Sequence, residues 1–171
     1  MIVIINSGPL IALAKLGLID LLPRLYGQVI LPTAVFTEVV ERGRERGYDD
    51  AFLVQLAIQQ EKLRVVKVKE EDLPADIQDL PLDSGEKQVL YLARREKVGL
   101  ALFDDERVRE EARASGLQVK GTVGVIIQAY RAELIGLKDV ENIIEAIVSR
   151  EDIWISEELC RRVLEKVKTT G

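Results

Sequence analysis

The stretch Leu100-Ala101-Leu102-Phe103-Asp104-Asp105 decides the fold, because four apolar residues run directly into two adjacent carboxylates. A short, fully apolar run is typical of a central strand in a parallel sheet, since such a strand is covered on both faces. Open α/β sheets bind ligands where strands end and helices begin, so acids here indicate a site at the carboxyl edge of a sheet. Two neighbouring carboxylates also repel each other unless a cation or a proton lies between them.

The beginning of the chain repeats this arrangement. Residues 1–5 are apolar, Asn6 and Ser7 follow them, and Pro9 suits the first turn of a helix. Short apolar runs continue to alternate with helical patterns, which predicts a parallel sheet covered by helices on both faces, with right-handed crossovers. The predicted strands are residues 1–5, 29–31, 64–68, 100–103 and 118–120.

The helical patterns lie between and after these strands. Residues 69–81 are acidic and contain two prolines, so we predict a loop there. The predicted fold class is α/β, a three-layer α/β/α arrangement with a five-stranded parallel sheet, and residues 1–171 form one domain with a sizeable core. The predicted helices begin at Pro9, at Pro32 and near Thr122, and span about residues 18–25, 50–61, 85–97, 106–115, 137–148 and 156–168.

Composition removes whole classes of mechanism. The 171-residue chain has no histidine, which excludes Ser-His-Asp triads, Cys-His dyads and the usual histidine-containing zinc sites. The single cysteine, Cys160, lies in a helical pattern beside Leu159 and Val163, so we expect a core thiol. The net charge of −5 argues against nucleic-acid binding through a broad basic surface and leaves local basic patches open. The mechanisms that remain use carboxylate side chains.

The sequence contains no sign of a membrane segment. No apolar run reaches the roughly 18 residues that a spanning helix needs. Residues 1–5 lack the positive flank and the cleavage site of a signal peptide. We therefore predict a cytoplasmic protein without membrane association.

The segment Asp83-Ser84-Gly85-Glu86 has two interpretations. In a capping box, Asp83 caps a helix and Glu86 reaches back to its amide, a common pattern worth about 1 kcal/mol. Glu86 also shares a helical stripe with Val89, Leu90 and Ala93, which points a carboxylate toward the core, where it needs a partner. Both the cap and a metal-ligand role stay open.

The other candidate ligands also have ordinary explanations. Asp104 and Asp105 suit the N-cap and first turn of the next helix, where the helix dipole favours acids. Glu38 flanks the apolar stripe of its helix, as a solvated surface glutamate does. Asn6 can cap the helix that follows the first strand.

Taken together, these segments resemble the PIN-domain family, in particular the VapC-like toxin ribonucleases and their uncharacterised relatives. The resemblance spans most of the chain and depends on the order and spacing of motifs that are individually weak. They are Asn6-Ser7-Gly8-Pro9-Leu10-Ile11-Ala12-Leu13, Leu31-Pro32 with Glu38-Val39-Val40, Leu82-Asp83-Ser84-Gly85-Glu86, Leu102-Phe103-Asp104-Asp105 and Gly121-Thr122. The segment Trp154-Ile155-Ser156-Glu157-Glu158 is similar to the tail of one PIN-like subgroup.

The resemblance implies a five-stranded parallel sheet, endoribonuclease activity on single-stranded RNA and a Mg²⁺ or Mn²⁺ site at the strand ends. The metal ligands that it implies are Asn6, Glu38, Glu86 and one or both of Asp104 and Asp105, with the four acids as catalytic residues. Ser7 and Thr122 are the expected substrate contacts at this site, and Arg107, on a basic helix face, is expected to contact the RNA backbone. The position at the strand end favours Asp104 as the ligand, whereas the spacing to Val108 favours Asp105.

Asn6 departs from the family pattern, because most PIN nucleases have an aspartate at this position. An amide keeps a carbonyl oxygen as a ligand and loses one negative charge. Oxygen donors without imidazole or thiolate favour hard cations, so Mg²⁺ or Mn²⁺ is the expected ion for phosphodiester hydrolysis. Basic helix faces at residues 94–97 and 107–113 can hold the RNA backbone or can simply be solvated.

Three functions stay open at this level. The first is an RNA endonuclease acting as a toxin that a small cognate antitoxin protein neutralises. The second is a catalytically weak or inactive PIN fold that binds RNA or protein, which Asn6 favours. The third is an unrelated acidic α/β phosphatase or response-regulator-like domain, and it ranks last because no acidic pair follows the first strand. Surplus apolar residues in the C-terminal helices, about residues 137–168, also predict a homodimer.

Overall fold

The computed structural model describes residues 1–170, and its sheet has five parallel strands in the order β3-β2-β1-β4-β5. The strands are β1 (Ile2–Ile5), β2 (Gln28–Pro32), β3 (Arg64–Val66), β4 (Leu100–Leu102) and β5 (Gln118–Lys120). Every pair of neighbouring strands is parallel. The predicted α/β class and the five-stranded parallel sheet are therefore confirmed.

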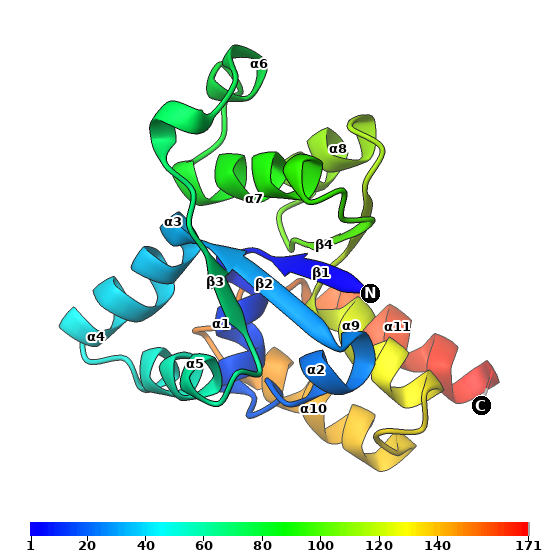
Figure 1. Cartoon of the computed structure of the whole chain (residues 1–171). Coiled ribbons are helices and arrows are strands. Elements are labelled where there is room, and N and C mark those ends of the chain that lie inside the picture. Colours follow the sequence, from blue (N-terminus) through cyan, green and yellow to red (C-terminus); the bar gives the residue numbers. More distant parts are fainter. Residues whose placement is uncertain (171) are drawn as a thin grey trace.

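Helices cover both faces of this sheet and form the outer two of three layers (Figure 1). On one face lie α7 (Ser84–Arg95) and α8 (Glu106–Ala114). On the other lie α1 (Ser7–Lys15), α2 (Leu21–Tyr26), α5 (Asp49–Gln59) and α9 (Thr122–Arg131). Among the helices of residues 1–170, none combines the length and the apolar content that crossing a membrane requires.

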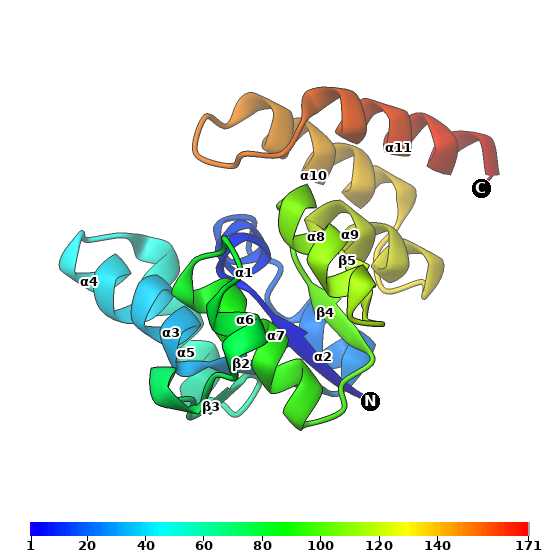
Figure 2. The ribbon, with the colours of Figure 1, turned by 90° about the horizontal axis from the view of Figure 1, so that it is seen from above.

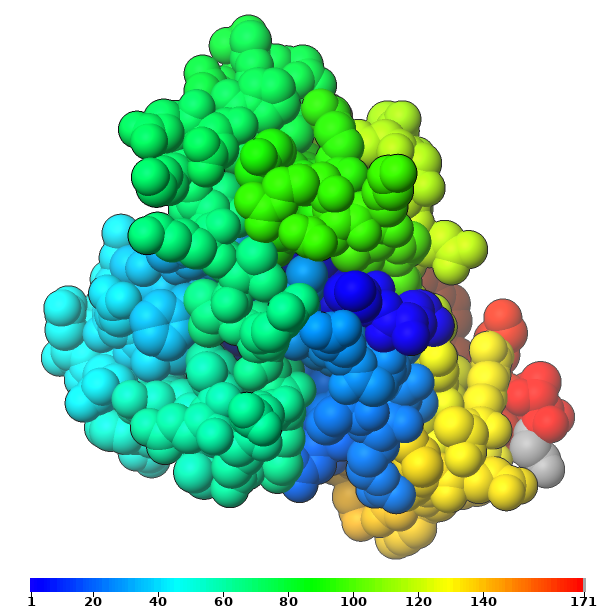
Figure 3. Space-filling model, in the orientation of Figure 1, coloured from blue at the N-terminus to red at the C-terminus, as the bar shows by residue number. Residues whose placement is uncertain are grey.

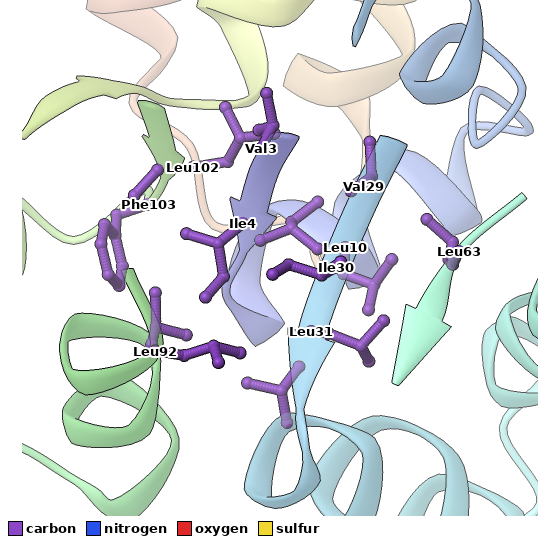
Figure 4. Packing of buried hydrophobic residues seen from close by; sticks show 14 of the residues in the cluster. Val3, Ile4, Leu10, Val29, Ile30, Leu31, Leu63, Leu92, Leu102 and Phe103 are labelled. Carbon is purple, nitrogen blue, oxygen red and sulfur yellow. The ribbon is translucent and has the colours of Figure 1, made fainter. Parts of the chain in front are cut away.

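The main core lies between the sheet and its two helical layers (Figure 4). Side chains of Val3, Ile4 and Ile30 from the central strands pack with Leu10 of α1 and Leu92 of α7. Alternate residues of a strand point to opposite faces, so a strand with helices on both sides must be apolar throughout. This explains why the short apolar runs of the sequence predict the strands well.

The last two helices lie outside these layers. The helices α10 (Leu137–Ser149) and α11 (Glu157–Thr170) pack against each other and against α9 (Figure 2, orange to red). Their apolar faces form a second buried cluster that includes Ile144 and Cys160, which confirms the core thiol. Much of the apolar surface on which we based the homodimer is therefore covered within the chain, and the dimer stays a prediction.

The segment at residues 69–81 differs from the predicted loop. It contains the short helices η2 (Glu70–Asp72) and α6 (Ala75–Gln78). Pro74 stands at the N-cap of α6, where its missing N–H leaves no helical hydrogen bond unmade. Pro74, one of the two prolines that indicated a loop, therefore marks a helix boundary.

The helix predicted from Pro32 is divided into three pieces. They are α3 (Thr33–Phe36), the π-helical turn η1 (Thr37–Arg42) and α4 (Gly43–Glu45). Glu38 lies in the π-helical turn. Such turns are frequent at functional sites, because the wider turn changes the direction of its side chains.

The carboxyl ends of β1 and β4 meet at the centre of the sheet. The amino end of the chain, dark blue in Figure 3, reaches the surface. Met1 is exposed, and β1 is fully buried from Val3 onward. The N–H of Asn6 donates to the carbonyl oxygen of Leu102 at 3.0 Å. The strand order changes direction between β1 and β4, and open α/β sheets bind ligands at such a switch point.

Candidate active site

A cavity of about 530 Å³ lies beyond the ends of β1 and β4. Its lining includes all five residues predicted as metal ligands, namely Asn6, Glu38, Glu86, Asp104 and Asp105. Ser7 and Asp83 also line it. The fold therefore brings together side chains from the ends of two strands, from the π-helical turn and from the first turn of α7.

Asp104 is held in place by Thr122. The backbone N–H of Thr122 donates to Asp104 Oδ1, and its hydroxyl donates to Oδ2, each at 2.7 Å. Burial raises the pKa of Asp104, while these two hydrogen bonds and the nearby Arg109 charge act in the opposite direction. Asp104 is thus a partly buried carboxylate with a fixed orientation.

Two glycines allow the chain to pass close to this carboxylate. A Cβ atom on Gly121 would lie 2.7 Å from Asp104 Oδ1, which is too close for any side chain. A Cβ atom on Gly8 would lie 3.8 Å from Oδ2, in ordinary contact. Gly121 is therefore needed for the Asp104 geometry, and Gly8 borders it from the start of α1.

Asp105 has a different environment from its neighbour. It is exposed and caps α8, because Oδ1 accepts the backbone N–H of Arg107 at 2.9 Å. The guanidinium of Arg107 also pairs with it at 3.1 Å. This contact lowers the pKa of Asp105. The structure distinguishes an anchored Asp104 from a solvent-facing Asp105, and both line the cavity.

Glu86 is both a helix cap and a lining residue of the cavity. Its N–H donates to Asp83 Oδ1 at 2.8 Å, and its Oε2 accepts the N–H of Asp83 at 2.9 Å, which completes the predicted capping box. Within residues 1–170, Oε1 accepts no hydrogen bond. Burial raises the pKa of Glu86, and the negative charges of Asp83 and Asp105 add to this shift.

Glu38 is exposed but fixed by a contact across the site. Its Oε2 accepts the hydroxyl hydrogen of Ser7 at 2.7 Å. The same oxygen lies close to Gly85, where an added Cβ would approach it to 3.6 Å. Glu38 thus lies between the first turns of α1 and α7. A solvated surface glutamate would make no such contacts.

Asn6 does not cap α1 through its side chain, so the ordinary explanation for this residue is wrong. The side chain makes no capping hydrogen bond, although the residue occupies the N-cap position. Asn6 is 9% exposed and lines the cavity. Its amide can therefore offer a carbonyl oxygen to the site.

The three predicted substrate contacts have different positions. Ser7 lines the cavity and holds Glu38. Thr122 is 0% exposed and both of its donors serve Asp104, so it supports the site and cannot touch a substrate in this conformation. Arg107 is exposed and paired with Asp105, close enough to Glu86 for its charge to lower the pKa of that carboxyl.

The donor set fits a hard divalent cation through its chemistry. All of the donors are carboxylate or amide oxygens, without imidazole or thiolate, as Mg²⁺ and Mn²⁺ prefer. Among residues 1–170, no three acids stand close enough to form a ready-made metal site. Mg²⁺ is usually held by one or two carboxylates and keeps several waters, so it does not require three acids in direct contact with it.

The loop between α10 and α11 adds residues that sequence reasoning did not place here. Lys15, Asp152 and Trp154 line the cavity together with the predicted acids. Lys15 Nζ lies 3.4 Å from Asp152 Oδ2 and donates to the Asp152 carbonyl at 2.9 Å, which fastens the loop to α1. The similarity of residues 154–158 to a PIN-like tail was a signal for this region, but not for its position.

A family model described as a PIN domain matches residues 2–169 of this chain. Among solved structures, the chain is similar to a domain of a functionally unknown protein from Methanocaldococcus jannaschii DSM 2661. That likeness has 19% sequence identity and a TM-score of 0.46, and it covers 70% of this chain and 89% of the other. A comparison with curated proteins gave no match.

Proposed function

Because the chain belongs to the PIN-domain family, a nuclease-type fold, we propose that it is a Mg²⁺- or Mn²⁺-dependent endoribonuclease that hydrolyses phosphodiester bonds of single-stranded RNA. The observation that carries this proposal is the single cavity shared by Asn6, Glu38, Glu86, Asp104 and Asp105. Independent helix caps and surface acids would have no reason to face one cavity at the switch point of the sheet.

Each residue has a defined task in this proposal. Asn6, Glu38, Glu86 and one or both of Asp104 and Asp105 would hold the ion. When bound, the ion supplies an activated water and neutralises charge on the phosphate. Glu86 Oε1 is free to accept a proton from the attacking water, and its raised pKa suits that role.

Four further residues keep this arrangement rigid. Thr122 fixes the orientation of Asp104, and Ser7 fixes that of Glu38. Lys15 and Asp152 hold the covering loop beside the cavity. A site held in this way loses little entropy when substrate binds, which favours catalysis.

The proposal is tested by cleavage of a fluorescent single-stranded RNA in Mg²⁺ or Mn²⁺. We expect cleavage by the wild type, none in EDTA, and a loss of roughly 100-fold or more in Asp104→Asn, since an electrostatic contribution of this size is typical of such groups. Asp79→Asn is the matched control, because Asp79 is an exposed aspartate outside the cavity. If the wild type in EDTA and the Asp104→Asn variant both cleave RNA as fast as the wild type with metal, the proposal is wrong.

A catalytically silent PIN fold that binds RNA is the second candidate. Two observations favour it, namely the neutral Asn6 amide at the end of β1 and the absence, among residues 1–170, of three acids in ligating proximity. For this function we expect the fluorescent RNA to bind to the protein and to stay uncleaved in any divalent cation. Metal titration then shows weak or no binding.

We further propose that the nuclease is a toxin controlled by a small cognate antitoxin protein, and that it forms a homodimer. An exposed apolar surface on and before α5 supports a protein partner, and its residues are Tyr48, Phe52, Leu53 and Leu56. A short reading frame beside the gene, whose product co-purifies with this chain and stops cleavage, is the expected result. A solution mass equal to the 19.2 kDa monomer at high concentration would exclude the homodimer.

A further inference from the structure

A second groove of about 510 Å³ adjoins the acidic cavity. It lies between α11 and the segment formed by β5 and α9. Asp104, Trp154 and Ile155 line both spaces, so the groove leads into the candidate active site. The helices α9 and α11 are in contact and lie side by side in Figure 1.

The charged residues that line this groove are mostly basic, although the whole chain is acidic. Its charged residues are Arg109, Lys120, Arg131 and Lys166 against Asp104 and Glu106. Within residues 1–170, Lys120, Arg131 and Lys166 form no ion pair within 4.0 Å. Most other basic residues that we considered for RNA binding are neutralised instead, as Arg94 is by Asp76 and Arg113 by Glu106. The groove therefore holds three basic side chains without an acidic partner in the described part of the chain, close to the candidate active site.

Two of these cations are held in position by neutral or weak contacts. Lys120 Nζ donates to Gln128 Oε1 at 2.6 Å, and Tyr26 donates to the same oxygen at 2.7 Å. Burial lowers the pKa of Lys120, and the nearby Arg131 charge adds to this shift. Arg109 Nε is buried and donates no hydrogen bond within residues 1–170, and it lies 3.7 Å from Glu106 Oε2 in a long ion pair. An anion in the groove would relieve the repulsion between Lys120 and Arg131.

Trp154 stands at the junction of the groove and the cavity with its ring in solvent. It is 92% exposed, whereas most large apolar side chains of the protein are buried. Its indole N–H donates to the Glu151 carbonyl at 3.0 Å, which fixes the position of the ring without covering its faces. An exposed, anchored aromatic ring beside a basic groove is the arrangement that single-strand-binding proteins use to stack on bases.

We propose that this groove binds single-stranded RNA, with Trp154 stacked on an unpaired base and Arg109, Lys120, Arg131 and Lys166 at the phosphates of the strand that enters the cavity. This inference rests on the proposed nuclease function and adds a substrate path to it. The volume is in the roughly 300–1,000 Å³ range of ligand pockets. Phosphates would supply the negative charge that the groove lacks, and a base would cover the exposed indole.

Trp154 is the only tryptophan in the chain, so its fluorescence reports on this site alone. Titration with a short oligouridylate in EDTA, which prevents metal-dependent cleavage, should quench the emission in a saturable and salt-sensitive way. Labelled RNA followed by fluorescence anisotropy gives the affinity of variants that lack the indole. We expect Trp154→Ala to weaken binding roughly 5- to 150-fold, the range for loss of one base-stacking contact, and Trp154→Phe to retain most of the affinity.

The contribution of the cations is tested with a matched pair on α11. Lys166→Ala removes a groove residue, whereas Lys168→Ala removes a lysine that faces Glu141. We expect only Lys166→Ala to weaken binding and to reduce the slope of log affinity against log salt, by about 0.7 for one lost phosphate contact. Equal effects of the two substitutions would contradict a specific groove.

The outcomes separate this inference from the nuclease proposal. Quenching with RNA but no cleavage in any divalent cation would support the groove and remove the nuclease activity. Normal cleavage with no quenching and unchanged binding by Trp154→Ala would overturn the groove and leave the nuclease. Quenching by polyglutamate but not by RNA would also overturn it, because the occupant would then be an acidic protein partner.

Discussion

Both carboxylate oxygens of Asp104 accept hydrogen bonds from Thr122, one from the backbone N–H and one from the hydroxyl, at 2.7 Å each. These bonds connect the end of β4 to the first turn of α9. The orientation of the acid at the switch point therefore depends on the connection after β5 as well as on β4. The side of the carboxylate that faces Gly8 stays next to the cavity.

Thr122→Val should destabilise the protein by about 1.5–3 kcal/mol, because it removes a buried hydrogen bond to a charged group and keeps the side-chain volume. Thr122→Ser retains the hydroxyl and is the matched control, with a smaller loss from the missing methyl group. Urea unfolding measures the free energy of unfolding of both variants. Mn²⁺ affinity should fall in Thr122→Val more than in Thr122→Ser, and equal affinities would show that Asp104 needs no support from this residue.

Gly121→Ala should displace Asp104, because the added Cβ would lie 2.7 Å from its Oδ1. We expect a stability loss of about 1–3 kcal/mol from overpacking, together with weaker metal binding. Gly124→Ala is the control on the same helix, since its Cβ would meet only Lys120 at 3.5 Å. That substitution should raise stability by up to about 1 kcal/mol, as alanine favours a helix interior. Unaltered metal affinity in Gly121→Ala would contradict the role of Asp104.

Ionisation of Tyr26 should lower the free energy of unfolding at high pH. Burial raises the pKa of Tyr26 to about 12, whereas a tyrosine in the unfolded chain ionises near pH 10. Its stabilisation is therefore complete below about pH 10 and is lost as the pH rises to about 12. Tyr26→Phe should lose about 1 kcal/mol at neutral pH through its contact with Gln128, and should show a flatter decline in unfolding free energy above pH 10. Identical declines in both proteins would contradict this assignment.

The sheet and the local cap of the site could be predicted from the sequence because both depend on neighbours in the chain. Residues 100–103 are apolar since β4 is covered on two faces, and spacing alone predicts the capping box of Asp83 and Glu86. The position of Asp104 at the end of this strand also follows from the pattern.

Contacts between distant segments could not be predicted in the same way. The hydroxyl of Thr122 was expected to border a substrate, and the structure turns it to Asp104, because burial of that carboxylate requires donors. Nothing in the spacing indicates that Trp154 stands beside the ends of β1 and β4. The division of the helix after Pro32 was missed too, since a π-helical turn has no local signature in this sequence.

Asn6→Asp should strengthen Mn²⁺ or Mg²⁺ binding and raise RNA cleavage, whereas Glu86→Gln should weaken both. A carboxylate at residue 6 adds Coulomb attraction to a divalent ion in a site of reduced dielectric, where an amide offers one neutral carbonyl oxygen. The gain can reach a few kcal/mol, offset in part by repulsion among the acids when no metal is bound. In the absence of metal, Asn6→Asp should therefore unfold at a lower urea concentration than the wild type, and added Mn²⁺ should reverse the order. Calorimetric metal titration and the fluorescent RNA assay decide the matter on the wild type and both variants. If neither substitution alters metal affinity, the two residues share a cavity but no metal site, and Glu86 is a helix cap alone.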